Sequence, residues 1–330
     1  MGRVPTTSLA TLLVVCAGAL QGAKTLDLYF IDVEGGQATL VVAPSGQSLL
    51  IDTGYTGFGG RDTLRIAAAA KDAGVKRIDT LLITHFHDDH VGGVANLLDR
   101  FPVTTFLDHG PSIETKDYPA AYAAAFAKGQ HKVIAAGDMI PIKDLDVTVV
   151  AAAGKAIGRK GEPNPFCAGI PQSQSDLEAG ENSQSAGVVI IFGKFRFADL
   201  GDLTWNKELA LLCPENKVGK IDLYLTTHHG GESSKAIWGM APRVAVMNNG
   251  PGKGGDPLGW KNVMASPGLE DLWQLHFALT GGKETNVPDT FIVNVDANDQ
   301  GKHLKVSALA DGSFTVTNPR NKFTRTYAAK

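Results

Sequence analysis

The stretch Thr-His-Phe-His-Asp-Asp-His occupies residues 84–90 and lies between two segments of regular structure. It follows a nearly continuous apolar run from Ile78 to Thr84, which is typical of a strand covered on both faces. It precedes a helical pattern from Val91 to Arg100, which ends ahead of Pro102. The sequence therefore predicts a connection between a buried strand and a helix that is rich in metal-binding side chains.

The spacing of these side chains predicts a metal site. His85 and His87 are two residues apart, so in an extended segment they leave the backbone on the same side. Asp89 and His90 lie at the turn into the helix and can reach a second point nearby. Imidazoles and a carboxylate suit zinc or a similar borderline ion, with positions left for water. The structural alternative is an exposed histidine-rich loop without metal, but the spacing and context favour the metal site.

The chain around this motif divides into two similar halves. Ahead of it, three strand-like runs separated by Gly-containing turns predict a β-meander, and a helix is expected at 61–73. After it we expect a hairpin (188–192 and 195–200), a helix (205–212), strands (221–226, 243–247 and 291–295), a helix (269–279) and a last hairpin (305–309 and 314–317). This pattern indicates a mixed α/β (α+β) fold with two sheets packed face to face and helices outside, giving four layers.

Residues 24–330 are interpreted as one domain, in which 266–330 form a C-terminal extension of unknown role. Residues 155–180 are rich in Gly, Pro, Gln and Ser and lack periodicity, so they are expected to form a long functional or mobile loop. The Gly-rich stretch 250–255 lacks the ending of a phosphate-binding loop and is interpreted as a loop at the rim of the site.

The first residues have the pattern of a secretory signal peptide. Arg3 precedes an uncharged apolar run from Leu9 to Leu20, and small residues follow it. We therefore predict cleavage of residues 1–23 and a secreted or periplasmic protein with no membrane span after cleavage. A membrane anchor is disfavoured because the run is short for a bilayer span of about 20 residues. A lipoprotein attached through Cys16 is the other alternative.

Cysteine content and charge bear on the environment and on the partners. Removal of the leader leaves Cys167 and Cys213, and an even pair in an oxidising compartment suggests a disulfide, with two buried free thiols as the alternative. The formal net charge of -3 shows no excess of basic residues of the kind that general nucleic-acid binding requires. We expect a small-molecule or cell-envelope substrate instead.

Residues 84–90 resemble the HxHxDH motif of the metallo-β-lactamase superfamily, and other segments agree. Asp52 resembles the superfamily's early aspartate, which supports the metal loop without binding metal. Asp202 follows a strand in a Gly-Asp pair, like the carboxylate that bridges the metals. His228 matches the last histidine ligand. The resemblance spans roughly residues 26–250 and implies an αββα sandwich that holds two divalent ions, zinc first and manganese or iron as alternatives.

One departure from the superfamily concerns the first metal. The superfamily commonly supplies a further histidine between the metal loop and the bridging aspartate, whereas this chain has no histidine in 181–185. That polar run resembles the branch that includes the hydrolase domain of the DNA-uptake protein ComEC. Within it, Asn182 and Ser185 are candidates for a weak metal ligand or a substrate contact, with a helix cap as the simpler role of Asn182. The resemblance then gives the first metal His85, His87 and Asp202, and the second Asp89, His90, His228 and Asp202.

The resemblance implies hydrolysis by a hydroxide formed on metals about 3.5–4 Å apart. Asp89 is expected to orient this nucleophile and accept its proton. The proton for the leaving group would come from metal-bound water or from a nearby histidine, with His109 and His229 as candidates. The ComEC-like motifs favour a phosphodiester or another phosphoester, with lactones and β-lactams as alternatives. A secreted module that binds a ligand or metal without catalysis is the alternative from another class.

Overall fold

The computed structural model describes residues 1–2, 24–114, 120–231, 233–296 and 301–330. The predicted leader falls on residues 1–23, so all but its first two residues lie outside the described ranges. Within these ranges, no helix has the length and apolar character needed to cross a bilayer.

The first sheet carries the metal loop. Its strands follow the order β20-β19-β18-β1-β2-β3-β4-β5-β6. They are β1 (Leu26–Phe30), β2 (Thr39–Val42), β3 (Ser48–Ile51), β4 (Ile78–Leu82), β5 (Val103–Asp108), β6 (Gln130–Val133), β18 (Leu304–Ala308), β19 (Phe314–Asn318) and β20 (Phe323–Tyr327). β1, β2 and β3 pair antiparallel, which confirms the predicted meander. β3, β4 and β5 are parallel, so the loops that follow them emerge at one edge of the sheet.

The second sheet has the order β17-β16-β15-β14-β12-β11-β8-β7, with β9 paired to β8. Its strands are β7 (Met139–Ile140), β8 (Asp146–Ala152), β9 (Lys155–Ala156), β11 (Gly187–Phe192), β12 (Phe195–Asp199), β14 (Leu223–Leu225), β15 (Val244–Met247), β16 (Asp271–His276) and β17 (Ile292–Asn294). β11 and β12 form the predicted hairpin. From β12 to β17 the strands run parallel, so the loops after β12, β14 and β15 also share one edge.

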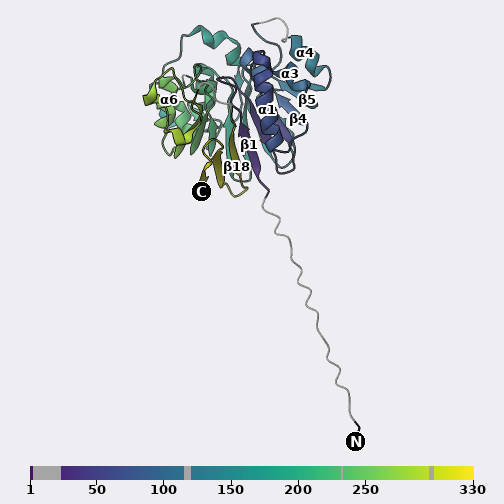
Figure 1. Ribbon diagram of the computed structural model, residues 1–330. Helices are drawn as coiled ribbons and strands as arrows, with labels where there is room; N and C mark the ends of the chain where they lie inside the picture. Colours follow the sequence, from purple (N-terminus) through teal and green to yellow (C-terminus); the bar gives the residue numbers. More distant parts are fainter. Residues whose placement is uncertain (3–23, 115–119, 232, 297–300) are drawn as a thin grey trace.

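Helices cover the outer faces of both sheets (Figure 1). The α-helices are α1 (Arg61–Asp72), α2 (Asp88–Val91), α3 (Val94–Leu98), α4 (Ala120–Phe126), α5 (Trp205–Leu212) and α6 (Pro257–Met264). Short 3₁₀ helices occupy connections: η1 (Phe58–Gly60), η2 (Pro165–Cys167), η3 (Asp176–Ala179), η4 (Glu181–Gln184), η5 (Thr227–Gly230), η6 (Lys235–Met240), η7 (Lys283–Thr285) and η8 (Asp289–Phe291). α1 to α4 pack on the first sheet, and α5 and α6 pack on the second. The predicted four-layer αββα sandwich is confirmed.

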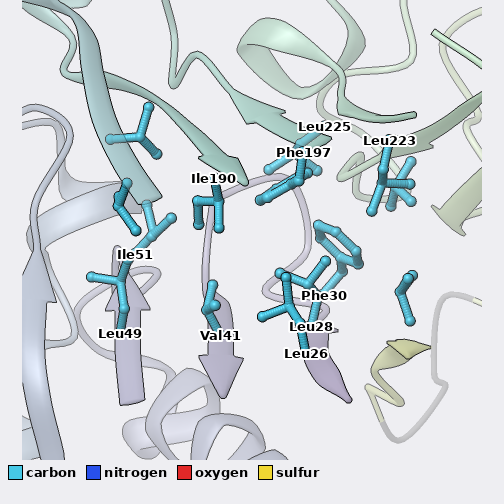
Figure 2. Close-up of a cluster of buried hydrophobic side chains, with 14 of the residues drawn as sticks. Leu26, Leu28, Phe30, Val41, Leu49, Ile51, Ile190, Phe197, Leu223 and Leu225 are labelled. Carbon is cyan, nitrogen blue, oxygen red and sulfur yellow. The ribbon is translucent and has the colours of Figure 1, made fainter. Parts of the chain in front are cut away.

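The core between the sheets explains why the two halves hold together. Figure 2 shows Leu26, Leu28 and Phe30 of β1 pointing toward Phe197 of β12 and Leu223 of β14. All of these side chains are almost completely buried. Alternate residues of β1 therefore face the second sheet, as the period of a strand requires.

One element differs from its prediction. The run 269–279 was expected to be helical, but residues 271–276 form β16, between β15 and β17. Both faces of β16 are covered, with Trp273 in the core between the sheets and Leu272 in the outer core. A strand buried on both faces has a continuous apolar sequence that periodicity cannot distinguish from a buried helix.

The C-terminal residues complete both sheets. β16 and β17 extend the second sheet, whereas β18 pairs antiparallel with β1 in the first. β18 and β19 form the hairpin predicted around Asp311 and Gly312. Residues 266–330 therefore supply strands to the same two sheets that carry the motifs.

The segment 155–180 is attached to the second half of the molecule. A disulfide joins Cys167 of η2 to Cys213 at the end of α5. The Asn164 side-chain amide donates hydrogen bonds of 2.9 Å to the carbonyl oxygens of Leu212 and Ala236. β10 (Glu162–Pro163) pairs with β13 (Glu215–Asn216) in a separate two-stranded sheet. This long segment therefore has a defined path over α5.

The packing between the sheets makes a direct prediction about stability. Leu28 is completely buried between the sheets, so Leu28→Ala leaves a cavity and is expected to lower the free energy of unfolding by about 2–5 kcal/mol. Leu279→Ala is the matched control, because that side chain is 63% exposed and its loss is expected to change stability by less than about 0.5 kcal/mol. Chemical denaturation of both variants measures the difference, and equal losses would contradict the described core.

Candidate metal centre

The metal loop, residues 84–90, leaves the end of β4 and enters α2. Asp52 follows the neighbouring strand β3 and has a left-handed φ of 61°. Its carboxylate accepts hydrogen bonds of 2.7 Å from the backbone N–H and from the hydroxyl of Thr84. These bonds hold the first residue of the metal loop against the sheet.

Asp52 also sets the orientation of His90. Its Oδ2 lies 2.7 Å from Nδ1 of His90, and both side chains are completely buried. When a metal ion binds Nε2, this contact would keep the remaining imidazole proton on Nδ1. Asp52 thus lies behind the loop, the position that the sequence resemblance implied for it.

Four side chains form a compact cluster, defined as Asp89, His90, Asp202 and His229. One potential ligand atom from each lies within 4.8 Å of all the others, and all four residues are buried. Asp202 Oδ2 lies 3.2 Å from Nε2 of His90 and from Nε2 of His229. Asp89 Oδ2 lies 3.3 and 3.2 Å from the same two nitrogens. Loops from both sheets therefore meet at one point.

The histidine at the end of β14 differs from the expectation. We expected His228 to bind the second metal and His229 to be a candidate proton donor, but His229 is the one that contacts Asp89. His228 Nε2 lies 3.7 Å from Asp202 Oδ2, outside the compact cluster. The reason is local: both residues have left-handed φ, 52° and 56°, in the turn η5. Sequence spacing alone does not reveal which of two adjacent histidines such a turn directs inward.

His85 and His87 lie beside the compact cluster, outside it. His85 Nε2 is 3.9 Å from Asp202 Oδ2 and 3.1 Å from Nδ1 of His87. His85 is completely buried, whereas the side chain of His87 is 36% exposed and its Nε2 is 3.3 Å from the Glu114 carboxylate. This second group of nitrogens is more open than the compact cluster.

Asn182 and Ser185 take different positions in the site. Asn182 Nδ2 lies 3.3 Å from Nε2 of His228. Ser185 is fully buried, and its hydroxyl accepts a hydrogen bond of 3.2 Å from the backbone N–H of Asp202. Asn182 is thus beside the metal-binding groups, whereas Ser185 holds the backbone that carries Asp202.

His109 contacts a buried carboxylate next to the metal loop. Its Nε2 lies 2.8 Å from the buried carboxylate of Glu181, and its ring packs 4.8 Å from that of Phe86. Glu181 also accepts hydrogen bonds from the backbone N–H of Phe86 and from the hydroxyl of Ser112. His109 and Glu181 therefore support the middle of the metal loop from behind. The strand end was visible in the sequence, but the direction of the side chain was not.

Lys253 was not predicted as a site residue. Its Nζ lies 2.5 Å from Oδ2 of Asp89, and it comes from the Gly-rich stretch 250–255. A close approach makes Gly254 necessary, because a Cβ at this left-handed position would lie 2.3 Å from the carbonyl oxygen of His229. The stretch therefore lies at the rim of the site, as predicted.

A cavity of about 350 Å³ opens beside these groups. Its lining includes the polar side chains of His228, His229 and Lys253 and the apolar side chains of Leu177, Leu203 and Trp205. The segment 155–180 contributes to the lining through Ser173, Ser175, Leu177 and Glu178. This long segment thus forms part of the wall of the candidate site.

The charges of the compact cluster are strongly coupled. Burial opposes ionisation of Asp202, but the charges of His229 and His90 outweigh it and hold the pKa of this carboxyl well below its usual value. Burial would likewise raise the pKa of Asp89, yet the charge of His90 lowers it. For His90, burial lowers the pKa and the carboxylates of Asp202 and Asp89 raise it above the usual value. Both carboxylates are thus kept ionised and require nearby positive charge.

The residues present fit a divalent cation. Imidazole nitrogens and carboxylate oxygens are zinc ligands, and the compact cluster brings two of each together. Among the described residues, Oδ1 of Asp202 is a buried oxygen with no hydrogen-bond partner. A buried carboxylate oxygen without a donor is costly unless a cation satisfies it. The chemistry of the site therefore matches a metal centre.

A family model described as the metallo-beta-lactamase superfamily matches residues 31–169, which include the whole metal loop. This part of the chain is therefore similar to the metallo-β-lactamase superfamily. Asp202, His228 and His229 lie beyond the matched residues, so geometry alone brings them to the superfamily's metal loop.

Curated relatives match a shorter part of the chain. The hydroxyacylglutathione hydrolase of Erwinia tasmaniensis is 38% identical over 90 residues, which are 26% of this chain and 31% of that protein. That of Klebsiella pneumoniae is 34% identical over 92 residues, 27% of this chain and 32% of that protein. The match thus spans about a third of the length of these relatives.

One similar solved structure is the metallo-beta-lactamase fold protein YhfI of Bacillus subtilis. Its TM-score is 0.46 at 11% identity, and the match covers 78% of this chain and 98% of that one. Another is Tm1679, described as a metal-dependent hydrolase of the β-lactamase superfamily, with a TM-score of 0.45, 16% identity, and coverage of 76% and 95%.

The turn that carries the two histidines rests on a buried acid. The Ser233 hydroxyl donates a hydrogen bond of 3.0 Å to Glu208 of α5, and Tyr224 and Thr227 join the same network through a contact of 2.6 Å between their hydroxyls. Burial raises the pKa of Glu208 to about 7, although hydrogen bonds from Thr227 and Ser233 act against it. Because the folded state holds this proton and the unfolded state releases it, stability falls as pH rises from about 4.5 through about 7.

We expect Glu208→Gln to remove this loss. Its stability relative to the wild type should increase between pH 4.5 and pH 8 by about 3 kcal/mol, the equivalent of the difference between the two pKa values. Denaturant unfolding at several pH values measures it. Glu284→Gln removes one negative charge at an exposed position and is the control. A pH-independent difference between wild type and Glu208→Gln would contradict the buried protonated acid.

Proposed function

We propose that this protein is a metal-dependent hydrolase that binds two divalent ions on either side of Asp202. The observation that carries the proposal is the convergence of four histidines on one buried carboxylate oxygen, with Nε2 atoms 3.2–3.9 Å from Asp202 Oδ2. The histidines come from the segments after β4 and β14, and the carboxylate comes from the segment after β12. A purely structural role would not require so many desolvated, mutually coupled ionisable groups in one place.

Bound divalent ions would supply the reactive chemistry, by lowering the pKa of a water molecule and by stabilising negative charge on the substrate. The protein's own groups prepare the site. Asp52 holds the Nε2 of His90 toward the compact cluster. Asp89 has a carboxylate oxygen beside His90 and His229 and is the group that would orient a water molecule and accept its proton. Burial of the cluster strengthens each of these interactions.

The cavity supports a small substrate with an anionic group. The ammonium of Lys253 reaches the compact cluster through Asp89. A cation bound by Asp89 would compete with Lys253 for that carboxylate and leave the ammonium free to contact a substrate anion. The apolar side chains of Leu177, Leu203 and Trp205 in the same lining would contact an organic group of the substrate.

A phosphodiester or another phosphoester is the substrate that we propose. Two features support a phosphoester: Lys253 lines the cavity, and the run around Asn182 resembles the ComEC branch. The volume of about 350 Å³ and the net charge of -3 favour a small molecule over a long polynucleotide. Lactones and β-lactams are the alternatives for the same centre.

The sequence similarity to hydroxyacylglutathione hydrolases favours a second candidate, a thioester. It rests on a stretch of 90 to 92 residues, about a quarter of this chain. Thioesters with a carboxylate would also place a negative charge near Lys253.

We further propose that the protein is exported. The disulfide between Cys167 and Cys213 supports an oxidising compartment, where such bonds persist. A secreted or periplasmic location, in turn, favours phosphoesters over cytosolic thioesters.

The test combines metal content with a substrate panel. We expect about two ions per chain by elemental analysis, and hydrolysis of bis(p-nitrophenyl) phosphate in preference to a glutathione thioester, a lactone and a chromogenic β-lactam. Asp202→Ala removes the shared carboxylate and is expected to lose metal and at least about 100-fold in kcat/KM. Asp88→Ala, an exposed aspartate in the same motif, is the control and should retain both properties.

Each outcome has a distinct meaning. Preference for the thioester would replace the phosphoester as the substrate but keep the hydrolase. Metal binding without turnover of any ester, amide or phosphoester would favour a binding module. A wild-type protein without metal, or an Asp202→Ala variant with full activity, would refute the proposed function.

A further inference from the structure

We propose that His228 is a ligand of the first metal ion, together with His85, His87 and the shared carboxylate of Asp202. The inference rests on the proposed metal-dependent function and extends it, because neither the motif nor the family match assigns His228 to that ion. His228 would take the place of the histidine that the chain lacks between the metal loop and Asp202. We call the space beside these three histidines the open position.

The backbone of the turn η5 separates the two adjacent histidines. Both are in the left-handed region, with φ and ψ of 52° and 48° at His228 and of 56° and 26° at His229. Their ring centroids are 5.9 Å apart and the ring planes are inclined by 64°. His229 reaches Asp89, and its Nδ1 lies 3.1 Å from the Asn248 side chain behind it. His228 is therefore free to serve a different ion from its neighbour.

Two histidine nitrogens of the open position already face the shared carboxylate of Asp202. The Nε2 atoms of His228 and His85 lie 3.7 and 3.9 Å from the same oxygen, Asp202 Oδ2. His87 joins them through its Nδ1, 3.1 Å from the Nε2 of His85. Three imidazoles and one carboxylate oxygen are a complete set for a tetrahedral zinc ion. Without His228, the set would consist of two imidazoles and one shared carboxylate.

Asn182 lies beside His228, in a contact that a bound ion would replace. Its amide nitrogen lies 3.3 Å from the Nε2 of His228, so the amide contacts the nitrogen that would bind the ion. Among the described residues, the amide oxygen of Asn182 is buried and has no hydrogen-bond partner. Asn182 lies in the segment where the superfamily usually has a histidine ligand. It therefore contacts His228, the residue to which we assign that ligand role.

The two positions differ in exposure. The side chains of His90, His229 and Asp89 are 0–9% exposed, whereas those of His87 and His228 are 36% and 33% exposed. His228 also lines the cavity. The open position should therefore bind its ion more weakly, exchange it faster, and be the one that faces the substrate.

The first experiment compares adjacent histidines. Wild type, His228→Ala and His229→Ala are stripped with a chelator and titrated with Zn²⁺ by calorimetry, and the metal content is then measured by elemental analysis. We expect two ions in the wild type. In His228→Ala, one ion should bind with unchanged affinity and the weaker one at least about 100-fold more weakly. His229→Ala should instead lose the tighter ion. Thermal unfolding in chelator checks that both variants fold alike.

The second experiment gives a spectroscopic signature at the position itself. Cysteine thiolate is a metal ligand, so His228→Cys loaded with Co²⁺ should show a thiolate-to-cobalt charge-transfer band and recover the weaker ion. Ser175→Cys places a thiol in the same cavity at an exposed position and is the control that should show no such band.

The outcomes separate this inference from the function on which it rests. His228→Ala with two ions of unchanged affinity, or with loss of the same ion as His229→Ala, would overturn it. One ion in the wild type would also overturn it while leaving a mononuclear hydrolase. No ion in the wild type would overturn both the inference and the proposed function.

Discussion

The burial of one carboxylate, that of Asp202, is the constraint around which the site is organised. Its Oδ2 faces four imidazole nitrogens, and its Oδ1 is buried without a hydrogen-bond partner among the described residues. A buried carboxylate is tolerated only with matched positive charge or a cation. Two further contacts contribute to this balance of charge. Asp52 contacts His90, and Lys253 contacts Asp89. The buried negative charge of Asp202 thus lies where a bound metal ion would stabilise it.

The two-sheet architecture makes this convergence possible. β4 of the first sheet and β12 and β14 of the second end near one another, so three distant segments of the chain deliver their side chains to one point. The core of Leu28, Phe197 and their neighbours fixes the spacing of the sheets, and a packed core deforms little. The loops carry the chemistry, whereas the sheets determine where the loops start.

Local patterns in the sequence were enough for the fold, and the expectations that the structure does not follow have a common cause. For the candidate site, the patterns pointed to the metal loop, Asp52 and Asp202, because each follows a strand in a short motif. The direction of His109, the choice between His228 and His229, and the helix expected at 269–279 depend on tertiary packing or on φ values that no pattern encodes. Lys253 was missed because its partner Asp89 is 164 residues away in the sequence.

Anomalous diffraction from crystals of the zinc-loaded protein would show directly where the metal ions bind. We expect two peaks beside Asp202, each with ligand distances of about 2.0–2.3 Å. One should be bound by Asp89, His90 and His229, and the other by His85, His87 and His228. A protein without a peak beside Asp202, or with zinc bound only elsewhere on the chain, would contradict the account.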